Sequence, residues 1–385
     1  MLRSMLRVRS RTPVASLAAF VVSLMLVPGT AWATPHQLCN FGVGFSSLPV
    51  EWPWQGAYLD DVTAPTTSEA WAVGATYGSH QPYITHLVDH TFRMEAVPDL
   101  PNAAISAITM AGNQPLAVGS QSGARTPHPI ALRRDARGWH TMDVSIGDTI
   151  GGDFLNDVDA VSARNVWAVG GARAKATSDR VLLVLHWNGT KWTRPSVPMP
   201  EGGGQLTSVD ARLGDVWAVG HGPDGSFVLH RSDRRWALST VPVPTGAADI
   251  LLFGVAAHGP DDVWAVGSAF DGIEDRHAAV SHWDGTAWTS SMDDLPAGSH
   301  LQELLRVAVA DDGSLVAAGF QDVVGGEGPV VRERAPTDDV WTDIYPTGEE
   351  RVQPLGVTFV PGTRAAFLVG MNGRSGEPLA FWNCH

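Results

Sequence analysis

A short apolar motif, Trp-Ala-Val-Gly, recurs along the chain at a nearly constant interval and constrains the fold more than any other feature. Full and degenerate copies start at residues 71, 116, 167, 217, 264, 316 and 367, at intervals of 45, 51, 50, 47, 52 and 51 residues. This is the period of propeller blades. A valine or isoleucine recurs before every copy: Val62, Ile108, Val158, Val209, Val255, Val307 and Val357. The sequence therefore predicts seven copies of one structural unit.

Each unit is predicted to form four antiparallel strands. In the third unit, residues 155–160 and 166–170 form the first two strands, residues 181–187 the third, and residues 190–194 the start of the fourth. The second strand is continuously apolar, which is typical of a strand covered on both faces. Asn188-Gly189 is a strong hairpin signal. The predicted fold class is all-β, a seven-bladed β-propeller of four-stranded antiparallel blades.

The two ends of the chain predict how the ring closes. The seventh unit stops after its third strand, near residue 384, whereas residues 38–54 precede the first unit and have no repeat of their own. An N-terminal strand paired into the last blade would remove an exposed sheet edge. It would also bring Cys39 near Cys384, and this pair of cysteines is predicted to form a disulfide if the protein is exported.

The first residues indicate export. Four arginines and no acid precede an apolar run over residues 14–27, and Ala31 and Ala33 then provide the small residues of a signal-peptidase site. This order predicts a signal peptide over residues 1–33, followed by a secreted propeller domain over residues 34–385. The alternative is an uncleaved membrane anchor, but the apolar run is shorter than the ~20 residues that a spanning helix needs.

The charge of the chain narrows its partners. The formal net charge is −14, and the predicted removal of the four N-terminal arginines would change it to −18, because −14 − 4 = −18. Nucleic acids and anionic membranes are polyanions, so neither is expected as a partner of so acidic a surface. The partner classes that remain are an extracellular glycan and another protein, bound by a monomer.

Two repeated motifs resemble those of a known group. Asp-Val-Trp-Ala-Val-Gly at 262–267 and His-Trp-Asp-Gly-Thr-Ala-Trp at 282–288 resemble the repeats of secreted bacterial β-propeller proteins, which are loosely similar to galactose-oxidase/kelch and sialidase-type propellers. The resemblance covers nearly all of the predicted mature chain and implies the fold, but not an activity. The blades lack the diglycine of kelch repeats, and residues 188–192 are out of register with the sialidase Asp-box.

Aromatic and histidine residues have a structural interpretation. Fifteen tryptophans could provide platforms for sugars, but those of the repeated motif occupy equivalent strand positions, so packing between blades accounts for them. His186, His230 and His282 also share one position of the repeat. They match no metal-site spacing, and a structural or surface role is expected.

One acidic segment could bind a metal. Residues 271–275, Asp-Gly-Ile-Glu-Asp, are the best candidate for calcium, although they lack the alternating oxygen ligands of an EF-hand. The other acidic pairs fall in or beside turns, where aspartate caps the backbone. No other cofactor is expected.

Catalysis has little support in the sequence. A sialidase would need a tyrosine nucleophile and an arginine cluster, and the chain has four tyrosines and no such arginine motif. A copper site like that of galactose oxidase would need a cysteine that the predicted disulfide already uses. Neither a serine-nucleophile elbow nor a phosphate loop is present. A pair of catalytic carboxylates has no local signature, so a carbohydrate-active hydrolase or lyase stays open as an alternative.

The expected binding surface is the face that carries the longer loops. In a propeller, the links between second and third strands and the links between blades lie on one face, here called the long-loop face, and loops on a rigid scaffold concentrate binding residues. The candidates are Tyr77, His80, Arg125, His128, Arg173, Arg180, His221, Asp224, Asp271, Glu274, Arg276, His277, Asp322 and Arg374.

The sequence favours recognition of an extracellular or cell-wall carbohydrate through this face. A protein partner, a carbohydrate-active enzyme and a structural scaffold are the alternatives. An enzyme would require convergent carboxylates with raised pKa values at the channel. A lectin would require exposed aromatic residues beside hydrogen-bonding groups, and a protein-binding face would require an apolar patch.

Overall fold

The computed structural model describes residues 45–383 apart from positions 54–55, 79, 124–125, 145–146, 148–150, 175–178, 324–325, 339, 345 and 347–350. All described residues belong to one compact unit, Cys39–His385. The predicted signal peptide, Cys39, Cys384 and Arg125 lie outside the described residues, so the cleavage and the disulfide stay predictions. Within the described part of the chain, no helix has the length and apolar character needed to cross a membrane.

The described residues form seven antiparallel sheets of four strands. The first three blades consist of β2 (Ala57–Thr66), β3 (Glu69–Thr76), β4 (Pro82–Val88) and β5 (Thr91–Met94); of β6 (Ala103–Ala111), β7 (Gln114–Ser122), β8 (Pro127–Asp135) and β9 (Gly138–Met142); and of β10 (Phe154–Ser162), β11 (Asn165–Arg173), β12 (Arg180–Trp187) and β13 (Trp192–Thr193). The next two consist of β14 (Gln205–Ala211), β15 (Val216–Gly222), β16 (Gly225–Ser232) and β17 (Arg235–Thr240); and of β18 (Asp249–Gly259), β19 (Asp262–Phe270), β20 (Arg276–Trp283) and β21 (Trp288–Met292). The last two consist of β22 (Gln302–Val309), β23 (Leu315–Val323), β24 (Gly326–Arg334) and β25 (Thr342–Asp343); and of β26 (Val352–Phe359), β27 (Ala366–Asn372), β28 (Pro378–Asn383) and β1 (Ser46–Leu48).

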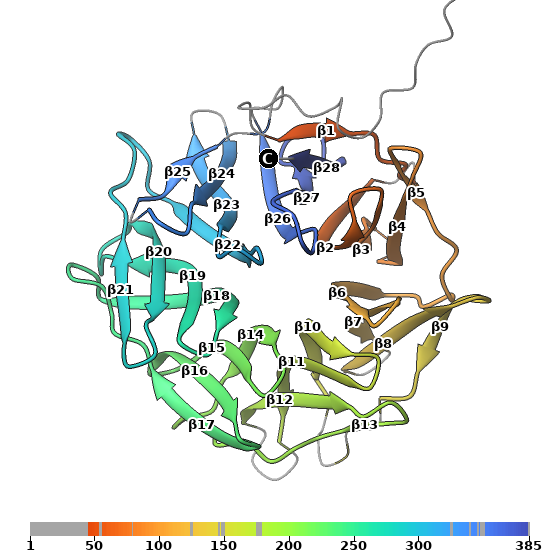
Figure 1. Ribbon diagram of the computed structural model, residues 1–385, viewed down its shortest axis with the longest axis horizontal. Helices are drawn as coiled ribbons and strands as arrows, with labels where there is room; N and C mark the ends of the chain where they lie inside the picture. Colours follow the sequence, from red (N-terminus) through yellow and green to blue (C-terminus); the bar gives the residue numbers. More distant parts are fainter. Residues whose placement is uncertain are drawn as a thin grey trace, which may run out of the picture. The chain divides into compact units, whose positions relative to one another are not determined.

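The N-terminal strand completes the seventh blade. β1 pairs antiparallel with β28, with Ser46 opposite Trp382 and Leu48 opposite Ala380. In Figure 1 the two strands lie side by side, and the sheets follow one another in chain order around an axis, with the first strand of each blade innermost. The predicted propeller of seven four-stranded blades is therefore confirmed, and so is its closure by the N-terminal segment.

The repeated motif forms the second strand of each blade and packs between blades. Its tryptophans Trp71, Trp167, Trp217 and Trp264 are at most 7% exposed. One core cluster shows the pattern: Trp167 of β11 packs with Leu206 of the next blade's innermost strand. Burying one such apolar side chain contributes about 1.5–3 kcal/mol. The blades are thus held together face to face, and the packing role expected for these tryptophans is confirmed.

The second and third strands extend further than the hydrophobic pattern predicts. β11 continues to Arg173 and β12 begins at Arg180, and these two residues are paired across the sheet. Main-chain hydrogen bonds continue the ladder beyond the apolar core, where no hydrophobic periodicity marks it. Several residues that the sequence assigned to loops therefore lie at the ends of strands, where the backbone is fixed: His128, Arg173, Arg180, His221, Arg276, His277 and Asp322.

Each innermost strand carries a β-bulge at the same level in all blades, and β2, β10 and β18 have a second irregularity near their ends. In β2, Leu59 pairs with Gly74 and Asp61 pairs with Val73, which leaves Asp60 unpaired. The unpaired residues of the seven blades, here called the bulge ring, are Asp60, Ser106, Asn156, Thr207, Phe253, Leu305 and Leu355. A feature repeated at one level of every blade is part of the architecture, and bulges re-aim side chains.

The glycine that ends each motif is required by this bulge. A Cβ added to Gly267 would lie 1.8 Å from the carbonyl oxygen of Leu251, and one added to Gly170 would lie 2.0 Å from that of Phe154. The other five motif glycines face the innermost strand in the same way, at 1.9–2.1 Å. No side chain fits at such a distance. The glycine of Trp-Ala-Val-Gly is thus the sequence mark of the bulge.

Four blades carry a second repeated feature near their short turns, here called the blade-base cluster. In the fifth blade the Trp264 ring stacks on the His282 ring at 3.9 Å, and both residues hydrogen-bond to one oxygen of Asp262, at 2.8 and 2.9 Å. Trp167 and His186 make the same two bonds to Asn165. In the fourth blade the Trp217–His230 stack recurs and only the histidine bonds to Asp215. In the first blade the Trp71–His86 stack recurs, with His86 4.0 Å from Glu69 and without these hydrogen bonds. These histidines therefore have the structural role expected of them.

Candidate functional site at the axial mouth

The bulge ring lies on the propeller axis towards the long-loop face. Each innermost strand starts at that face and ends at the short turn before the second strand, and the bulge falls in its first half. In the first blade, Leu59 and Val62 both point into one apolar core cluster, so the two residues between them turn to the axis. Asp61 lines an axial cavity, and Asp60 precedes it on the same side. All members of the ring are partly exposed.

The bulge ring is divided into a polar and an apolar arc. The first four blades contribute Asp60, Ser106, Asn156 and Thr207, and the last three contribute Phe253, Leu305 and Leu355. The backbone is equivalent in every blade, so only the side chains distinguish the two arcs. The apolar arc therefore offers partly exposed leucine and phenylalanine side chains from three consecutive blades, and exposed apolar groups favour the binding of ligands.

Two residues of the polar arc, Asn156 and Thr207, are held in place by hydrogen bonds to the adjacent blade. The Asn156 side-chain amide donates to the Leu206 carbonyl at 2.7 Å, and the Thr207 hydroxyl donates to the Leu252 carbonyl at 2.9 Å. Asp60 differs, because its carboxylate has no hydrogen-bond or ion-pair partner among the described residues. Burial raises the pKa of Asp60 to about 7, although the charge of Arg306 opposes this shift.

Four of the residues predicted from sequence lie around the bulge ring. Each contacts the residue of an innermost strand that stands two positions before the bulge residue. The Tyr77 ring lies 5.5 Å from that of Tyr58, and the Arg180 guanidinium lies 5.3 Å from the Phe154 ring. The other two contacts pair His221 with Gln205, at 3.1 Å, and Arg276 with Glu303, at 3.4 Å. These contacts and the bulge ring together define the axial mouth.

Two polar atoms at the axial mouth are buried without a hydrogen-bond partner among the described residues. They are Nη1 of Arg180 and Nδ1 of His221. The pKa of His221 is lowered, chiefly by burial; the charge of Asp249 opposes this shift and that of Arg180 adds to it. An orphaned buried polar atom costs about 1–3 kcal/mol, and such atoms mark places where a bound group can complete the bonding.

The remaining predicted residues do not gather at the axial mouth. His80, His128, Arg173, Asp224, Glu274 and Arg374 are exposed elsewhere on the long-loop side. Asp322 organises the link between the fifth and sixth blades by accepting hydrogen bonds from the main-chain nitrogens of His300 and Leu301, both at 3.0 Å. Arg125 lies outside the described residues.

An acidic axial cavity lies below the ring, towards the short turns. It measures about 330 Å³ and is lined by residues of all seven innermost strands. Asp61, Asp157, Asp159 and Asp210 line it together with Arg306 and Arg212. The carboxylates accept hydrogen bonds from the innermost strand of the next blade. Asp157 accepts from the Val209 nitrogen and Asp159 from the Ala211 nitrogen, both at 2.8 Å.

Burial dominates the electrostatics of this cavity. It raises the pKa of Asp61 and of Asp159 to about 7, and the neighbouring carboxylates Asp157 and Asp210 add to these shifts. An enzyme of this fold would need convergent carboxylates with raised pKa values at the channel, and this cavity contains such carboxylates. Here, however, each carboxylate also clamps the backbone of another blade, so its geometry fits a structural role.

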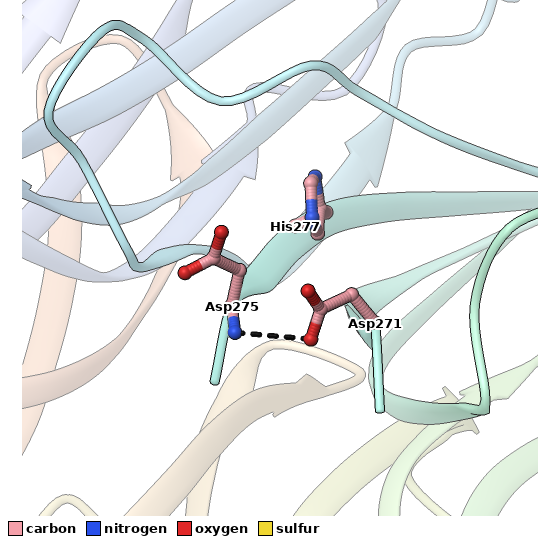
Figure 2. Close-up of side chains that lie close together, drawn as sticks. All are labelled: Asp271, Asp275 and His277. Atoms are coloured by element: carbon pink, nitrogen blue, oxygen red, sulfur yellow. Dashed lines mark hydrogen bonds between the residues drawn. The ribbon is translucent and has the colours of Figure 1, made fainter. Parts of the chain in front are cut away.

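A second cluster lies on the long-loop side of the fifth blade, between β19 and β20. One ligand atom from each of Asp271, Asp275 and His277 lies within 4.8 Å of the others, and Figure 2 shows the two carboxylates and the imidazole gathered at the loop. The segment 271–275 was the calcium candidate. The structure adds His277 from the adjoining strand, and an imidazole changes the ion that the group suits.

Sequence reasoning found the face but missed the ring at its centre. The sequence marked only Val307 and Val357 in the last two innermost strands and did not single out Leu305 or Leu355, because a bulge breaks the alternation that separates inward from outward residues. The available signal was the motif glycine. It recurs in all seven units, and the close backbone approach that accompanies the bulge in every blade leaves no room for a side chain there.

The sequence matches no described protein family and no curated protein. Solved structures match in fold. YCF48 bound to D1 peptide is similar with a TM-score of 0.58 and 10% identity, over 90% of this chain and 97% of that chain. YCF48 from Cyanidioschyzon merolae has a TM-score of 0.56 and 15% identity, over 89% and 99%. The extracellular domain of the hybrid two-component system BT4673 from B. thetaiotaomicron has a TM-score of 0.55 and 10% identity, over 88% of this chain but 39% of that one. At these identities the likeness shows the fold.

Proposed function

We propose that this protein is an exported recognition propeller that binds an extended peptide segment of a partner protein at the axial mouth. The division of the bulge ring into a polar and an apolar arc carries the proposal. A peptide has both properties within one short segment, because apolar side chains alternate with main-chain donors and acceptors. Export is part of the proposal and rests on the signal-peptide pattern of residues 1–33.

The apolar arc suits one large aliphatic or aromatic side chain of the peptide. Phe253, Leu305 and Leu355 come from three consecutive blades and are already partly exposed. Covering them removes apolar surface from water at about 25 cal/mol per Å². A few anchors of this kind dominate the affinity of most peptide and protein interfaces.

The other side of the mouth suits the polar groups of the same segment. On this side Arg180 and His221 are partly exposed and supply a guanidinium and an imidazole, each with one buried nitrogen that has no partner among the described residues. Asp60, which has no partner among the described residues, suits a lysine, an arginine or a terminal amine. The acidic net charge of −14 would steer such a basic segment towards the protein.

The similar solved structures support this choice in one respect. One of them is described as bound to a peptide, so a propeller of this fold can accept a ligand of this class. A carbohydrate, the ligand class that the sequence favoured, is the second candidate ligand, and one observation supports it. Trp52 is 43% exposed and stands outside the repeat, beside the Glu51–Arg93 ion pair, and this is the pairing of aromatic and polar groups that binds sugars.

Selection from a random peptide library on the immobilised protein tests the proposal. We expect enriched peptides to combine an apolar residue with a basic one. Their affinity should fall by about tenfold or more in Phe253→Ser and in Arg180→Met. Leu213→Ser is the matched control, because Leu213 is 89% exposed in the short turn between β14 and β15, away from the long-loop face.

Two outcomes would contradict the proposal. One is a library that yields no enriched sequence. The other is binding that Phe253→Ser and Leu213→Ser weaken equally, since the contact would then lie away from the mouth. Soluble polysaccharides serve as competitors in the same experiment. A polysaccharide that competes with the peptide for the parent protein and for Phe253→Ser, but not for Trp52→Ala, would favour the carbohydrate candidate instead.

A further inference from the structure

The group formed by Asp271, Asp275 and His277 differs from an ordinary acidic cluster in how each residue is held. The Asp271 Oδ1 atom accepts the main-chain N–H groups of residues 273, 274 and 275, at 2.8, 3.2 and 3.1 Å. Figure 2 shows the last of these bonds. Oδ1 of Asp271 is thus occupied, whereas its Oδ2 has no partner among the described residues.

The other two residues repeat this arrangement with partners from outside the loop. Oδ1 of Asp275 lies 2.7 Å from Nδ1 of His300, in the link to the sixth blade. His277 Nδ1 lies 2.8 Å from the main-chain oxygen of Asp293, at the end of the fifth blade. A carbonyl oxygen can only accept, so in the neutral imidazole of His277 the proton is on Nδ1 and the lone pair is on Nε2.

Each residue therefore has one atom fixed by a hydrogen bond, within the loop for Asp271 and from outside it for Asp275 and His277, and one atom left to bind something else. Metal-binding histidines and carboxylates show this pattern, in which a hydrogen bond to the other atom orients the ligand. The two carboxylates have no lysine or arginine partner among the described residues, although Asp275 pairs with the His300 imidazole at 2.7 Å. The bonds from His300 and Asp293 tie the group to two further segments of the propeller.

We propose that Asp271, Asp275 and His277 bind one divalent transition-metal ion through Oδ2, Oδ2 and Nε2. Imidazole combined with carboxylates suits zinc and its neighbours in the first transition row. Calcium prefers six to eight oxygen ligands, and in this loop three main-chain groups present N–H and not carbonyl oxygen to Asp271. Three protein ligands leave a coordination position open to water or to a bound molecule.

The site is independent of peptide recognition, although it adjoins the axial mouth. Arg276 lies between two of the ligands in sequence and pairs with Glu303 at the mouth. A bound ion would fix the segment 271–277 and so the position of that ion pair. Loss of metal binding would leave the apolar arc and Arg180 unchanged.

Calorimetric titration of the chelator-treated protein with zinc chloride tests the proposal. We expect one saturable site per chain, with affinity reduced by about 100-fold or more in His277→Gln and in Asp275→Asn. Replacement of the outer partner in His300→Gln should cost about 10–100-fold. His258→Gln is the matched control, because His258 forms an exposed pair with Asp262 at 3.3 Å outside the group. That variant should bind within about twofold of the parent protein.

Two results would overturn the proposal. The first is zinc binding that His277→Gln and His258→Gln affect equally, or no saturable site at all. The second is calcium binding of equal affinity in a parallel titration, which would exclude the assignment to a transition metal. All variants are checked by thermal unfolding without metal, where we expect parent-like melting, so that a loss of affinity is not a loss of fold.

Discussion

The blade-base clusters and the bulge ring are both repeated around the propeller, and they differ in what is repeated. In the clusters the side chains recur: tryptophan and histidine stack in four blades, at 4.4, 4.2, 3.5 and 3.9 Å. In the bulge ring only the backbone recurs, and the seven blades present seven side chains of six residue types.

This contrast indicates that, within one repeat, the blade-base cluster serves stability and the bulge residue serves recognition. A side chain that recurs at equivalent positions solves a problem that every blade shares, which is packing against its neighbour. A backbone feature that recurs while its side chains vary provides a set of equivalent attachment points. The clusters lie by the short turns and the ring lies towards the long-loop face. The packing role and the recognition role are therefore separated along the propeller axis.

The largest expected effect comes from removing a cluster tryptophan. Trp264→Ala should lower the free energy of unfolding by about 3–5 kcal/mol, because Trp264 is 7% exposed and supports both the His282 stack and the contact with Arg334 at 4.6 Å. Denaturant unfolding followed by tryptophan fluorescence measures the change. Phe253→Ala is the matched variant in the bulge ring and should cost under about 1 kcal/mol. Similar losses of unfolding free energy in Trp264→Ala and Phe253→Ala would contradict the distinction between a packing position and a recognition position.

A smaller loss is expected from the glycine that joins the two regions. In Gly267→Ala the new Cβ would lie 1.8 Å from the Leu251 carbonyl oxygen, so the bulge of the fifth blade has to move. Overpacking of this kind costs about 1–3 kcal/mol. Thermal unfolding measures the loss, and Gly298→Ala provides a reference for a turn glycine with open space around it, where the strain comes from its φ of +82° alone. Parent-like stability in Gly267→Ala would show that the close approach is not needed.

The axial cavity between the two regions should make stability depend on pH. Burial raises the pKa of Asp61 and Asp159 to about 7, against about 3.9 in an unfolded chain. Between these values the folded protein binds more protons, so its free energy of unfolding is highest near pH ~4 and falls as the pH rises to ~7. Urea midpoints measured across this range test the slope.

Two substitutions sharpen this measurement. Asp159→Asn removes one titrating group and should flatten the slope. Asp284→Asn should leave it unchanged, because three bonds from Thr286 and Ala287 lower the pKa of the exposed Asp284 to about 2, below the window. A stability that increases from pH ~4 to ~7 in the parent protein would mean that the carboxylates are ionised throughout.

The sequence predicted the repeated part of this molecule and missed the part that varies. Blade number, strand order and closure by β1 follow from periodic apolar residues, because burial between blades leaves a pattern in every unit. The bulge ring leaves no such pattern. Asp60 and Leu305 occupy the same place in the fold, but nothing local marks them as neighbours of one axis. Tyr77, Arg180, His221 and Arg276 were found only as members of a longer set.

The metal candidate illustrates the same limit on a smaller scale. Asp271 and Asp275 were grouped because they are close in sequence, whereas the residues that orient Asp275 and His277 come from other segments. The partner of Asp275 is His300, and the partner of His277 is the Asp293 carbonyl. Both lie at least sixteen positions away in the chain. Spacing in sequence identifies a loop, and the fold decides whether its side chains are held in place.

The smallest effect on stability, and the sharpest test of the comparison, is expected in the apolar arc. Leu305 is partly exposed and belongs to none of the core clusters formed by described residues, so Leu305→Ser should change the free energy of unfolding by under about 1 kcal/mol. The same variant should weaken binding of a library-selected peptide by about tenfold. Leu304→Ser, one position earlier, reverses the expectation: Leu304 is fully buried, so that variant should destabilise the sixth blade severely. If Leu305→Ser instead destabilises as much as Leu304→Ser, the leucine is part of the core, and the bulge would no longer separate a residue for recognition from a residue for packing.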